Sequence, residues 1–333
     1  MMKRLLNYKT AVLAAAVFLM ITLISGCAGN TETVSKTALK LDTVVTITLY
    51  GESNPEIIDS AFLEIDRLEA LMDVNNKASD IYRLAKNAGE WVSISDETAE
   101  VLRMAGEYYT VSGGYFDITA APLVELWNVN GGGYLPTESE ISAAAALVDG
   151  SALEVDGNSA RLARNGMKAD LGGIAKGYIA DKVKEHLISL GVEHAVIDLG
   201  GNIILIGYKP DGSKYSVGVK NPLDKDGELL CIVEGCDETM VSSGIYERYF
   251  EQGGKKYHHI IDPFTGAPSE SDLAGVTVIS KNSARADALS TICLLLGSEA
   301  AINLVENTAD AEAIFVSRSG EIYKTSGIDE RIK

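Results

Sequence analysis

Asp287 and Thr291 are the first candidates for chemistry in this sequence, because an acid and a hydroxyl stand four residues apart. In a helix, residues at this spacing share a face. The neighbours of Asp287 are mostly apolar, and a carboxylate in such surroundings is costly unless it is paired. A hard divalent cation prefers oxygen ligands of both kinds. The spacing therefore indicates a cation site, and a solvated acid on the outer face of the helix is the alternative.

A glycine-rich stretch at residues 170–178 (DLGGIAKGY) stands where a strand is expected to give way to a helix. Glycine lets a ligand approach the backbone closely. A helix N-terminus offers free N–H groups and a positive dipole end, which suit phosphate. The stretch matches neither the GxGxxG nor the P-loop pattern. A phosphate site and a tight turn before a helix both remain open.

His258 and His259 end an extended stretch just before the turn residues 262–266 (DPFTG). Such a pair could bind a metal, or one imidazole could act as a general base near neutral pH. A structural role is the alternative. A separate stretch at residues 114–119 (GYFDIT) carries two aromatic rings, which could stack on a ring-shaped ligand or pack in the core.

The elements that must position these side chains predict an α+β fold. Residues 38–49 alternate apolar and polar, which predicts one long half-buried strand. Helical spacing or capping predicts helices at residues 55–72, 96–110, 138–147, 174–190, 283–296 and 300–306. Strands are expected between them without a strict βαβ rhythm, so we expect mixed sheets packed against helices. A soft boundary at residues 150–165 divides the chain into two halves that contribute to one cleft.

The N-terminus predicts export. Three cations precede an apolar run at residues 11–24, which has the length of a signal-peptide core and is short for a membrane span of about 20 residues. Small residues before Cys27 resemble the bacterial lipobox, in which the peptide is cut before the cysteine and the thiol is acylated. We expect a signal peptide at residues 1–26, a lipidated Cys27 with a tether at 27–37, and a lipid anchor on the extracytoplasmic face of the cell membrane. An ordinary secretory signal and an uncleaved anchor are alternatives.

The charge of the chain limits its partners. The formal net charge is −18, and removal of residues 1–26 takes away three cations and no acids, which leaves −21. Such acidity argues against nucleic acid and against adhesion to anionic lipid by charge. The three later cysteines imply no disulfide framework, although Cys231 and Cys236 could pair across a hairpin.

The order of these stretches resembles the ApbE family, the FAD:protein FMN transferases. The matching segments are residues 116–127 (FDITAAPLVELW), 170–178 (DLGGIAKGY), 243–248 (SGIYER), 259–266 (HIIDPFTG) and 286–291 (ADALST). Each segment alone is a weak indication of the family, but all five occur in the same order as in the family. The resemblance covers residues 38–327, which we expect to form the flavin transferase domain.

The resemblance implies a role for each matching position. His259 would be the base near the transfer centre. Mg²⁺ would be held by the side chains of Asp287 and Thr291 and by the backbone oxygen of Gly173. The positions that would contact or line the FAD site are Leu41, Asn75, Tyr115, Phe116, Asp117, Asp170, Lys176 and Ile261.

The implied reaction is one phosphoryl transfer. A threonine hydroxyl of an exported acceptor attacks the FMN-side phosphorus of FAD, and AMP leaves. The acceptor class that the family suggests is a subunit of a redox-driven ion pump or an electron-transfer complex. A Mg²⁺-dependent FAD pyrophosphatase and a lipoprotein that only binds flavin are the alternatives.

The sequence departs from the family pattern in places, among them Gly173, which replaces a small hydroxyl residue of some members, and Asn75, which gives a testable prediction. Leu41-Asp42-Thr43 stands where many members have Met-Gly-Thr, and Asn75 stands where many have a tyrosine that stacks near the flavin. Loss of that aromatic face admits water to the pyrophosphate. We predict that the protein with Mg²⁺ and FAD, but without acceptor, slowly releases FMN and AMP. An AMP assay over hours checks this, and no AMP would contradict it.

Overall fold

The computed structural model describes residues 32–224 and 227–333, and these form the expected mixed α+β fold. Its centre is an eight-stranded sheet in which every neighbouring pair is antiparallel. The strands, in spatial order, are β1 (Thr33–Lys40), β2 (Thr43–Tyr50), β6 (Ala195–Leu199), β7 (Asn202–Ile206), β10 (Thr239–Gly244), β15 (Leu273–Ser280), β16 (Ala311–Ser317) and β17 (Ile322–Lys324).

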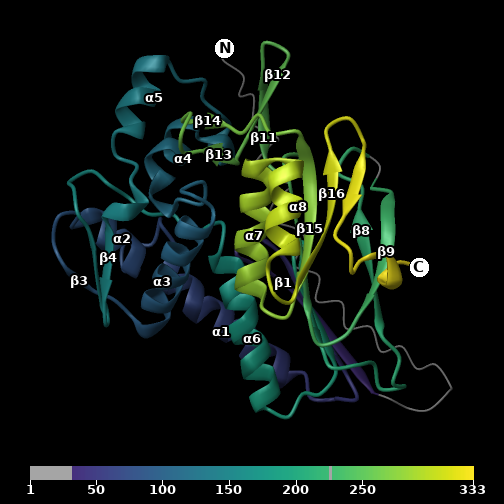
Figure 1. Ribbon diagram of the computed structural model, residues 1–333. Coiled ribbons are helices and arrows are strands. Elements are labelled where there is room, and N and C mark those ends of the chain that lie inside the picture. The colour runs from purple at the N-terminus through teal and green to yellow at the C-terminus, as the bar shows by residue number, and fades with distance from the viewer. Residues whose placement is uncertain (1–31, 225–226) are drawn as a thin grey trace, which may run out of the picture.

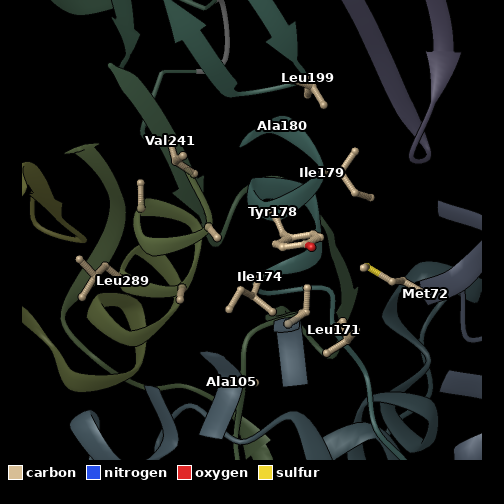
Figure 2. Packing of buried hydrophobic residues seen from close by; sticks show 14 of the residues in the cluster. Met72, Ala105, Leu171, Ile174, Tyr178, Ile179, Ala180, Leu199, Val241 and Leu289 are labelled. Carbon is tan, nitrogen blue, oxygen red and sulfur yellow. The ribbon is translucent and has the colours of Figure 1, made fainter. Parts of the chain in front are cut away.

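One face of this sheet is covered by three helices, α1 (Glu56–Met72), α6 (Ala175–Ser189) and α7 (Ser283–Leu296), with α8 (Ser298–Glu306) packed beside α7 (Figure 1). Helix α6 lies between α1 and α7. Figure 2 shows the ring of Tyr178 from α6 in the middle of the resulting core, between Leu289 of α7 and Met72 of α1. Helix α7 is apolar almost all round, which is typical of a helix with no solvent face.

The other face of the sheet is covered by the hairpin of β8 (Tyr215–Lys220) and β9 (Leu229–Gly235). The sheet is therefore buried on both sides at its middle, and all eight residues of β15 are buried. Cys231 and Cys236 are free thiols; one lies within β9 and the other follows it, so the possible disulfide across a hairpin is absent.

The rest of the chain forms a helical part beside the sheet. It contains α2 (Asp80–Lys86), α3 (Asp96–Val111), α4 (Ala121–Trp127), α5 (Glu138–Ala145) and a three-stranded sheet of β3 (Val92–Ser93), β5 (Ser159–Leu162) and β4 (Leu153–Asp156). Two short hairpins, β11 (Tyr249–Gln252) with β12 (Lys255–His258) and β13 (Ile261–Asp262) with β14 (Ala267–Pro268), lie near α4 and α5 (Figure 1). Trp127 joins the two groups, because its indole N–H donates to the Gly266 carbonyl at 2.7 Å.

The prediction of one long strand over residues 38–49 is wrong. The chain turns back at Leu41 and Asp42, whose φ angles of 53° and 55° lie in the left-handed region. Such a two-residue turn suits a tight hairpin but normally uses Asn and Gly. The alternation correctly predicts that Val45, Ile47 and Leu49 are buried, whereas Leu39 is 78% exposed.

The N-terminal expectations are only partly covered by the structure. Strand β1 begins at Thr33, so the last five residues of the expected tether at 27–37 belong to the sheet instead. The expected signal peptide and Cys27 lie outside the described residues. Within residues 32–224 and 227–333, no helix is both long and apolar enough to cross a membrane.

The contact between α6 and α7 predicts the effect of one glycine substitution. A Cβ atom on Gly177 would stand 2.3 Å from the Ser283 carbonyl oxygen and 2.7 Å from the Asp287 Cβ. Gly177→Ala must push the two helices apart, and we expect it to lower the free energy of unfolding by about 1–3 kcal/mol.

Gly106→Ala is the matched control, because Gly106 is an exposed helical glycine with no atom within 4 Å of an added Cβ. For this variant we expect the free energy of unfolding to rise by up to about 1 kcal/mol, because alanine favours a helix more than glycine does. Urea unfolding of both variants measures the difference. Equal effects of the two substitutions would contradict the close contact.

Candidate active site

Asp287 is a buried carboxylate with one hydrogen-bond partner. Asn282 caps α7 by accepting the Arg285 N–H at 2.7 Å, which places Asp287 in the second turn of the helix. Asp287 is 4% exposed, so the alternative of a solvated acid is wrong. One of its oxygens accepts the Gly177 N–H at 2.8 Å, and no lysine or arginine of the described residues forms an ion pair with it. Burial raises the pKa of Asp287, and the charge of Lys176 opposes that rise.

Gly173 lies against the same part of α7. A Cβ atom on Gly173 would stand 3.3 Å from the Thr291 hydroxyl oxygen and 3.0 Å from the Phe116 ring. The structure thus brings together Gly173, Thr291 and Asp287, which the sequence separates by more than a hundred residues. In the described part of the chain, no three His, Cys, Asp or Glu side chains form a cluster suited to a metal. A carboxylate, a hydroxyl and a carbonyl nevertheless form a donor set that suits Mg²⁺, which commonly completes its shell with water and substrate phosphate.

The loop before α6 is fixed at Asp170. Its backbone N–H donates to the Ile118 carbonyl, and its carboxylate accepts the Gly172 N–H, both at 2.8 Å. Burial raises the pKa of Asp170, and the positive charge of Arg248 opposes part of that rise. Helix α6 then begins without a side-chain cap, because Ile174 occupies the N-cap position. The glycine-rich stretch is therefore a tight turn before a helix, and the free N–H groups at the uncapped helix end could also bind a phosphate. The two interpretations do not exclude each other.

Lys176, in the first turn of α6, is the cation of the site. Its charge lowers the pKa of Asp287, Glu247 and His259, so it lies among all three. It forms no ion pair within the described residues. A lysine that is surrounded by ionisable groups but bonded to none of them is suited to hold an anionic substrate.

Asp117 has a structural role. Its two oxygens accept the Thr119 N–H at 2.7 Å, the Thr119 hydroxyl at 2.6 Å and the Gly150 N–H at 2.8 Å. The carboxylate therefore ties the segment after Phe116 to the segment before β4. Burial raises its pKa, although these hydrogen bonds oppose the rise. It shapes the wall of the site through the backbone.

The two aromatic neighbours of Asp117 differ. Phe116 is buried and meets Tyr108 edge-on, with ring centroids 6.0 Å apart. Phe116 therefore packs in the core beside Gly173, and its contact with FAD stays a prediction. Tyr115 is half-buried and meets the ring of Phe264 edge-on at 4.8 Å. Because Phe264 is 64% exposed, this pair presents an aromatic surface to solvent.

His259 is held in one tautomer. Its Nδ1 lies 3.2 Å from the Arg248 carbonyl oxygen, and its backbone N–H donates to the same atom. A carbonyl only accepts, so Nδ1 carries the hydrogen and the Nε2 lone pair is free. Burial, followed by the charges of Arg248 and Lys176, lowers the pKa of His259 to about 4. The imidazole is therefore neutral at pH 7.

His258 is held in the opposite tautomer. Its Nε2 donates to the Ser269 carbonyl at 3.0 Å, and the ring is 4% exposed. Burial lowers its pKa to about 4 as well. The two rings are bonded to different segments, so nothing in their arrangement supports a His–His metal pair.

The remaining predicted positions are more peripheral. Leu41 lies half-buried in the β1–β2 turn. Asn75 is exposed after α1, and its N–H donates to the Asp73 carboxylate at 2.8 Å. Ile261 is buried with Leu123 and Trp127, so in this structure it packs against α4.

An open cleft of about 530 Å³ was missed by sequence reasoning. It is lined by Asp42, Val129, Asn130, Glu247, Arg248 and Tyr249. These residues come from three loops that are distant in sequence. The segment SGIYER pointed to one of the loops, but nothing in the sequence showed that the three meet.

Comparison with known proteins gives a consistent family. The model of the ApbE family matches residues 41–315. An FAD:protein FMN transferase of Klebsiella pneumoniae (strain 342) is 34% identical over 296 residues, which are 88% of this chain and 92% of that protein. An FAD:protein FMN transferase of Vibrio cholerae is 32% identical, and the matched region is 85% of this chain and 87% of that protein.

Solved structures agree with these relatives. The ApbE protein of Thermotoga maritima superposes with a TM-score of 0.82 at 28% identity, over 89% of this chain and 97% of that one. The flavin transferase ApbE from Vibrio cholerae also gives 0.82, at 26% identity, over 91% and 100% of the two chains.

The low pKa of His258 predicts a dependence of stability on pH. The folded ring binds a proton only near pH 4, whereas in the unfolded chain it does so near pH 6.5. The unfolded state therefore takes up more protons between these values, and the free energy of unfolding falls as pH falls from about 6.5 to 4. We expect a loss of roughly 3 kcal/mol from this ring.

His258→Phe should remove that share of the pH dependence. Arg318 still donates to the Ser269 carbonyl at 2.8 Å, so the variant leaves no buried acceptor unpaired. Denaturant unfolding at pH 7 and pH 5 compares the variant with the wild type. The same slope with pH in both proteins would contradict the assignment.

Proposed function

Because this chain belongs to the ApbE family, we propose that it is an FAD:protein FMN transferase that moves the FMN half of FAD onto a threonine of an exported protein and releases AMP. One observation carries the proposal. The buried, unpaired carboxylate of Asp287 meets Thr291 and Gly173 at the N-terminal end of α6, among ionisable groups that include Lys176 and a neutral histidine.

FAD would place its pyrophosphate at the start of α6. The helix end has no side-chain cap, and Lys176 supplies a positive charge that forms no ion pair with another described residue. Both features favour the two negative charges of a pyrophosphate. The exposed aromatic pair of Tyr115 and Phe264 offers a surface on which a flavin or adenine ring can stack.

Asp287, Thr291 and Gly173 would hold Mg²⁺. The ion, when bound, neutralises charge on the phosphate oxygens during transfer. Asp287 is buried and forms no ion pair within the described residues, although the charge of Lys176 acts on it, and a buried carboxylate of this kind is stabilised by a bound cation. The Gly177 N–H fixes one carboxylate oxygen and thereby orients the other.

His259 is the candidate general base. Its free Nε2 can accept the proton of the acceptor threonine. A pKa of about 4 makes it a weak base in the empty site. The negative charge of a bound pyrophosphate opposes the charges of Lys176 and Arg248, so FAD binding raises this pKa. The threonine oxygen then bonds to the FMN-side phosphorus, the bond to the bridging oxygen breaks, and AMP leaves.

We further propose that the protein works on the extracytoplasmic face of the cell membrane, anchored by lipid at Cys27. Five residues separate Cys27 from the start of β1 at Thr33. At about 3.5 Å per residue they span less than about 20 Å, so the anchored domain would stay close to the bilayer. A suitable acceptor is an exported domain of a redox-driven ion pump or an electron-transfer complex.

The deciding experiment mixes the purified protein with FAD, Mg²⁺ and the exported domain of a candidate acceptor. Flavin fluorescence on the acceptor band of a denaturing gel, together with AMP in the same tube, is the expected result. Asp287→Asn keeps the shape of the side chain and its bond to the Gly177 N–H but removes the charge. We expect it to lower transfer about 100-fold or more, because metal stabilisation is worth several kcal/mol.

Asp181→Asn is the matched control. Asp181 is a half-buried carboxylate of α6 whose two oxygens accept the Ser283 and Ala284 N–H groups at the start of α7, and the Asn variant keeps one of these two bonds. We expect it to retain transfer. Mg²⁺ should also raise the melting temperature of the wild type and not that of Asp287→Asn. AMP without labelled acceptor would favour the pyrophosphatase, and bound flavin without either product would leave a binding protein.

A further inference from the structure

We propose that the free edge of strand β1, here called the β1 edge, is the docking surface for an extended segment of the acceptor protein, which adds to the central sheet as one further strand. The inference rests on the proposed transfer, because it names how the second substrate of that reaction is held. The β1 edge is a main-chain surface at residues 33–40, apart from the side chains that suit FAD and Mg²⁺.

Alternate residues of β1 point their main-chain groups away from the sheet. Within the described residues, β2 is the single neighbour of β1. The Gly51 N–H donates to the Glu32 carbonyl at 2.7 Å, so Glu32 bonds toward β2. In an antiparallel pair, residues that bond to the partner alternate with residues whose N–H and C=O groups point outward. Residues 34, 36, 38 and 40 therefore bond to β2, whereas Ser35, Thr37 and Leu39 offer their main-chain groups to a further strand.

The β1 edge lacks the devices that usually protect the edge of a sheet. The strand is eight residues long, contains no proline, and pairs regularly with β2 from end to end. Its charged side chains are Lys36 and Lys40, and both are turned to the helix side, where they pair with Asp59 and Asp66 of α1 at 2.6 Å. The opposite edge strand, β17, has only three residues. A long, regular edge of this kind is a template for pairing with another chain.

The sheet face beside the β1 edge is uncharged, although the chain as a whole has a formal net charge of −18. At the turn end, Leu39 lies opposite Val44, and both are exposed. The rest of this face is formed by two cross-strand hydroxyl pairs, Thr37 with Thr46 and Ser35 with Thr48, each with its oxygens 2.9 Å apart. An added strand would place its own side chains next to these residues. The surface therefore suits a segment with small hydroxyl or apolar side chains, such as one that carries the acceptor threonine.

Strand β1 leads to the proposed active site. It is followed by Leu41 and Asp42, and Asp42 lines the open cleft together with Arg248. The carbonyl of Arg248 in turn holds the ring of His259. A segment bound along the β1 edge therefore continues toward the candidate base. Main-chain contacts along the edge would hold the acceptor, while the threonine beyond them enters the site.

The other end of β1 lies close to the proposed lipid anchor. Five residues separate Cys27 from Thr33, so the start of the strand would stay near the bilayer. An exported domain anchored in the same membrane can therefore reach the β1 edge and extend from there to the site. A second copy of this chain is less suited to the edge, because two strongly acidic proteins repel each other.

Thr37→Pro tests the proposal, because proline has no N–H group. The missing donor belongs to the β1 edge and not to the bonds with β2, and edge strands tolerate proline. With the acceptor that the wild type labels, we expect kcat/KM for the acceptor to fall at least about 10-fold, since the lost bond and the bulk of the ring remove more than about 1.4 kcal/mol of binding. The kcat at saturating acceptor and the Kd for FAD should stay within about twofold of the wild type, because the edge takes no part in the chemistry.

Thr37→Val is the matched control. It loses the same hydroxyl bond to Thr46 but keeps the N–H group and the preference for a strand. It should leave kcat/KM for the acceptor unchanged. Ser35→Pro makes the same change two residues away and should act like Thr37→Pro. Hydrogen exchange of the wild type gives a measure that needs no variant, since the amides of residues 33–40 should exchange more slowly when the acceptor is present.

The outcomes separate the two proposals. If the wild type labels the acceptor, but the proline variants label it as well as Thr37→Val does and exchange in β1 is not slowed, the edge assignment is overturned while the transferase stands. Sedimentation that shows a wild-type dimer, dissociated by Thr37→Pro, would identify a second copy as the occupant and would also overturn the assignment. If the wild type labels no exported acceptor, the transferase proposal fails and the edge assignment fails with it.

Discussion

The contact of α6 with α7 at Gly177 is the constraint on which the site depends. The absence of a side chain lets the two helices approach so closely that a Cβ would overlap the Ser283 carbonyl oxygen, and the N–H of Gly177 then reaches the carboxylate of Asp287. The same approach brings the loop at Gly173 against Thr291. The close contact at Gly177 therefore accompanies the burial of the acid, and the loop at Gly173 lies against Thr291 one turn further along α7. Around this contact, the sheet and the core of Figure 2 hold the helices in register.

Much of this arrangement follows from local sequence signals. The spacing of Asp287 and Thr291 on one helix and the limits of α7 are local properties, and the structure has them as predicted. Whether that face of the helix is exposed to solvent or buried is not a local property. It depends on α6 and the sheet, which the spacing of residues on α7 does not describe. The sequence could therefore identify the pair but not decide between a cation site and a solvated acid.

The errors have equally specific causes. The β1–β2 hairpin was missed because Leu41 and Asp42 adopt left-handed backbone angles without the Asn or Gly that normally signals such a turn. Across the two-residue turn the buried face changes parity: Leu39 pairs with Val44, and both are exposed, whereas Val45 pairs with Ala38 and is buried. Apolar residues at 39 and 41 nevertheless continue the alternation in the sequence and so conceal the turn. The cleft was missed because its lining comes from three segments that are distant in sequence, and two of them are joined through the stacked rings of Phe250, Tyr257 and Trp127. Aromatic residues in a sequence predict burial but not their partners.

The distribution of charge around His259 suggests an order of events. Lys176 and Arg248 both lower the pKa of the ring, so the empty site holds a poor base. An anion beside Lys176 removes this effect, whereas an uncharged peptide segment does not. The base therefore becomes effective when the phosphates are in place. In the proposed transfer this arrangement would be useful, because the substrate that carries the group to be transferred would also raise the pKa of the candidate base, His259.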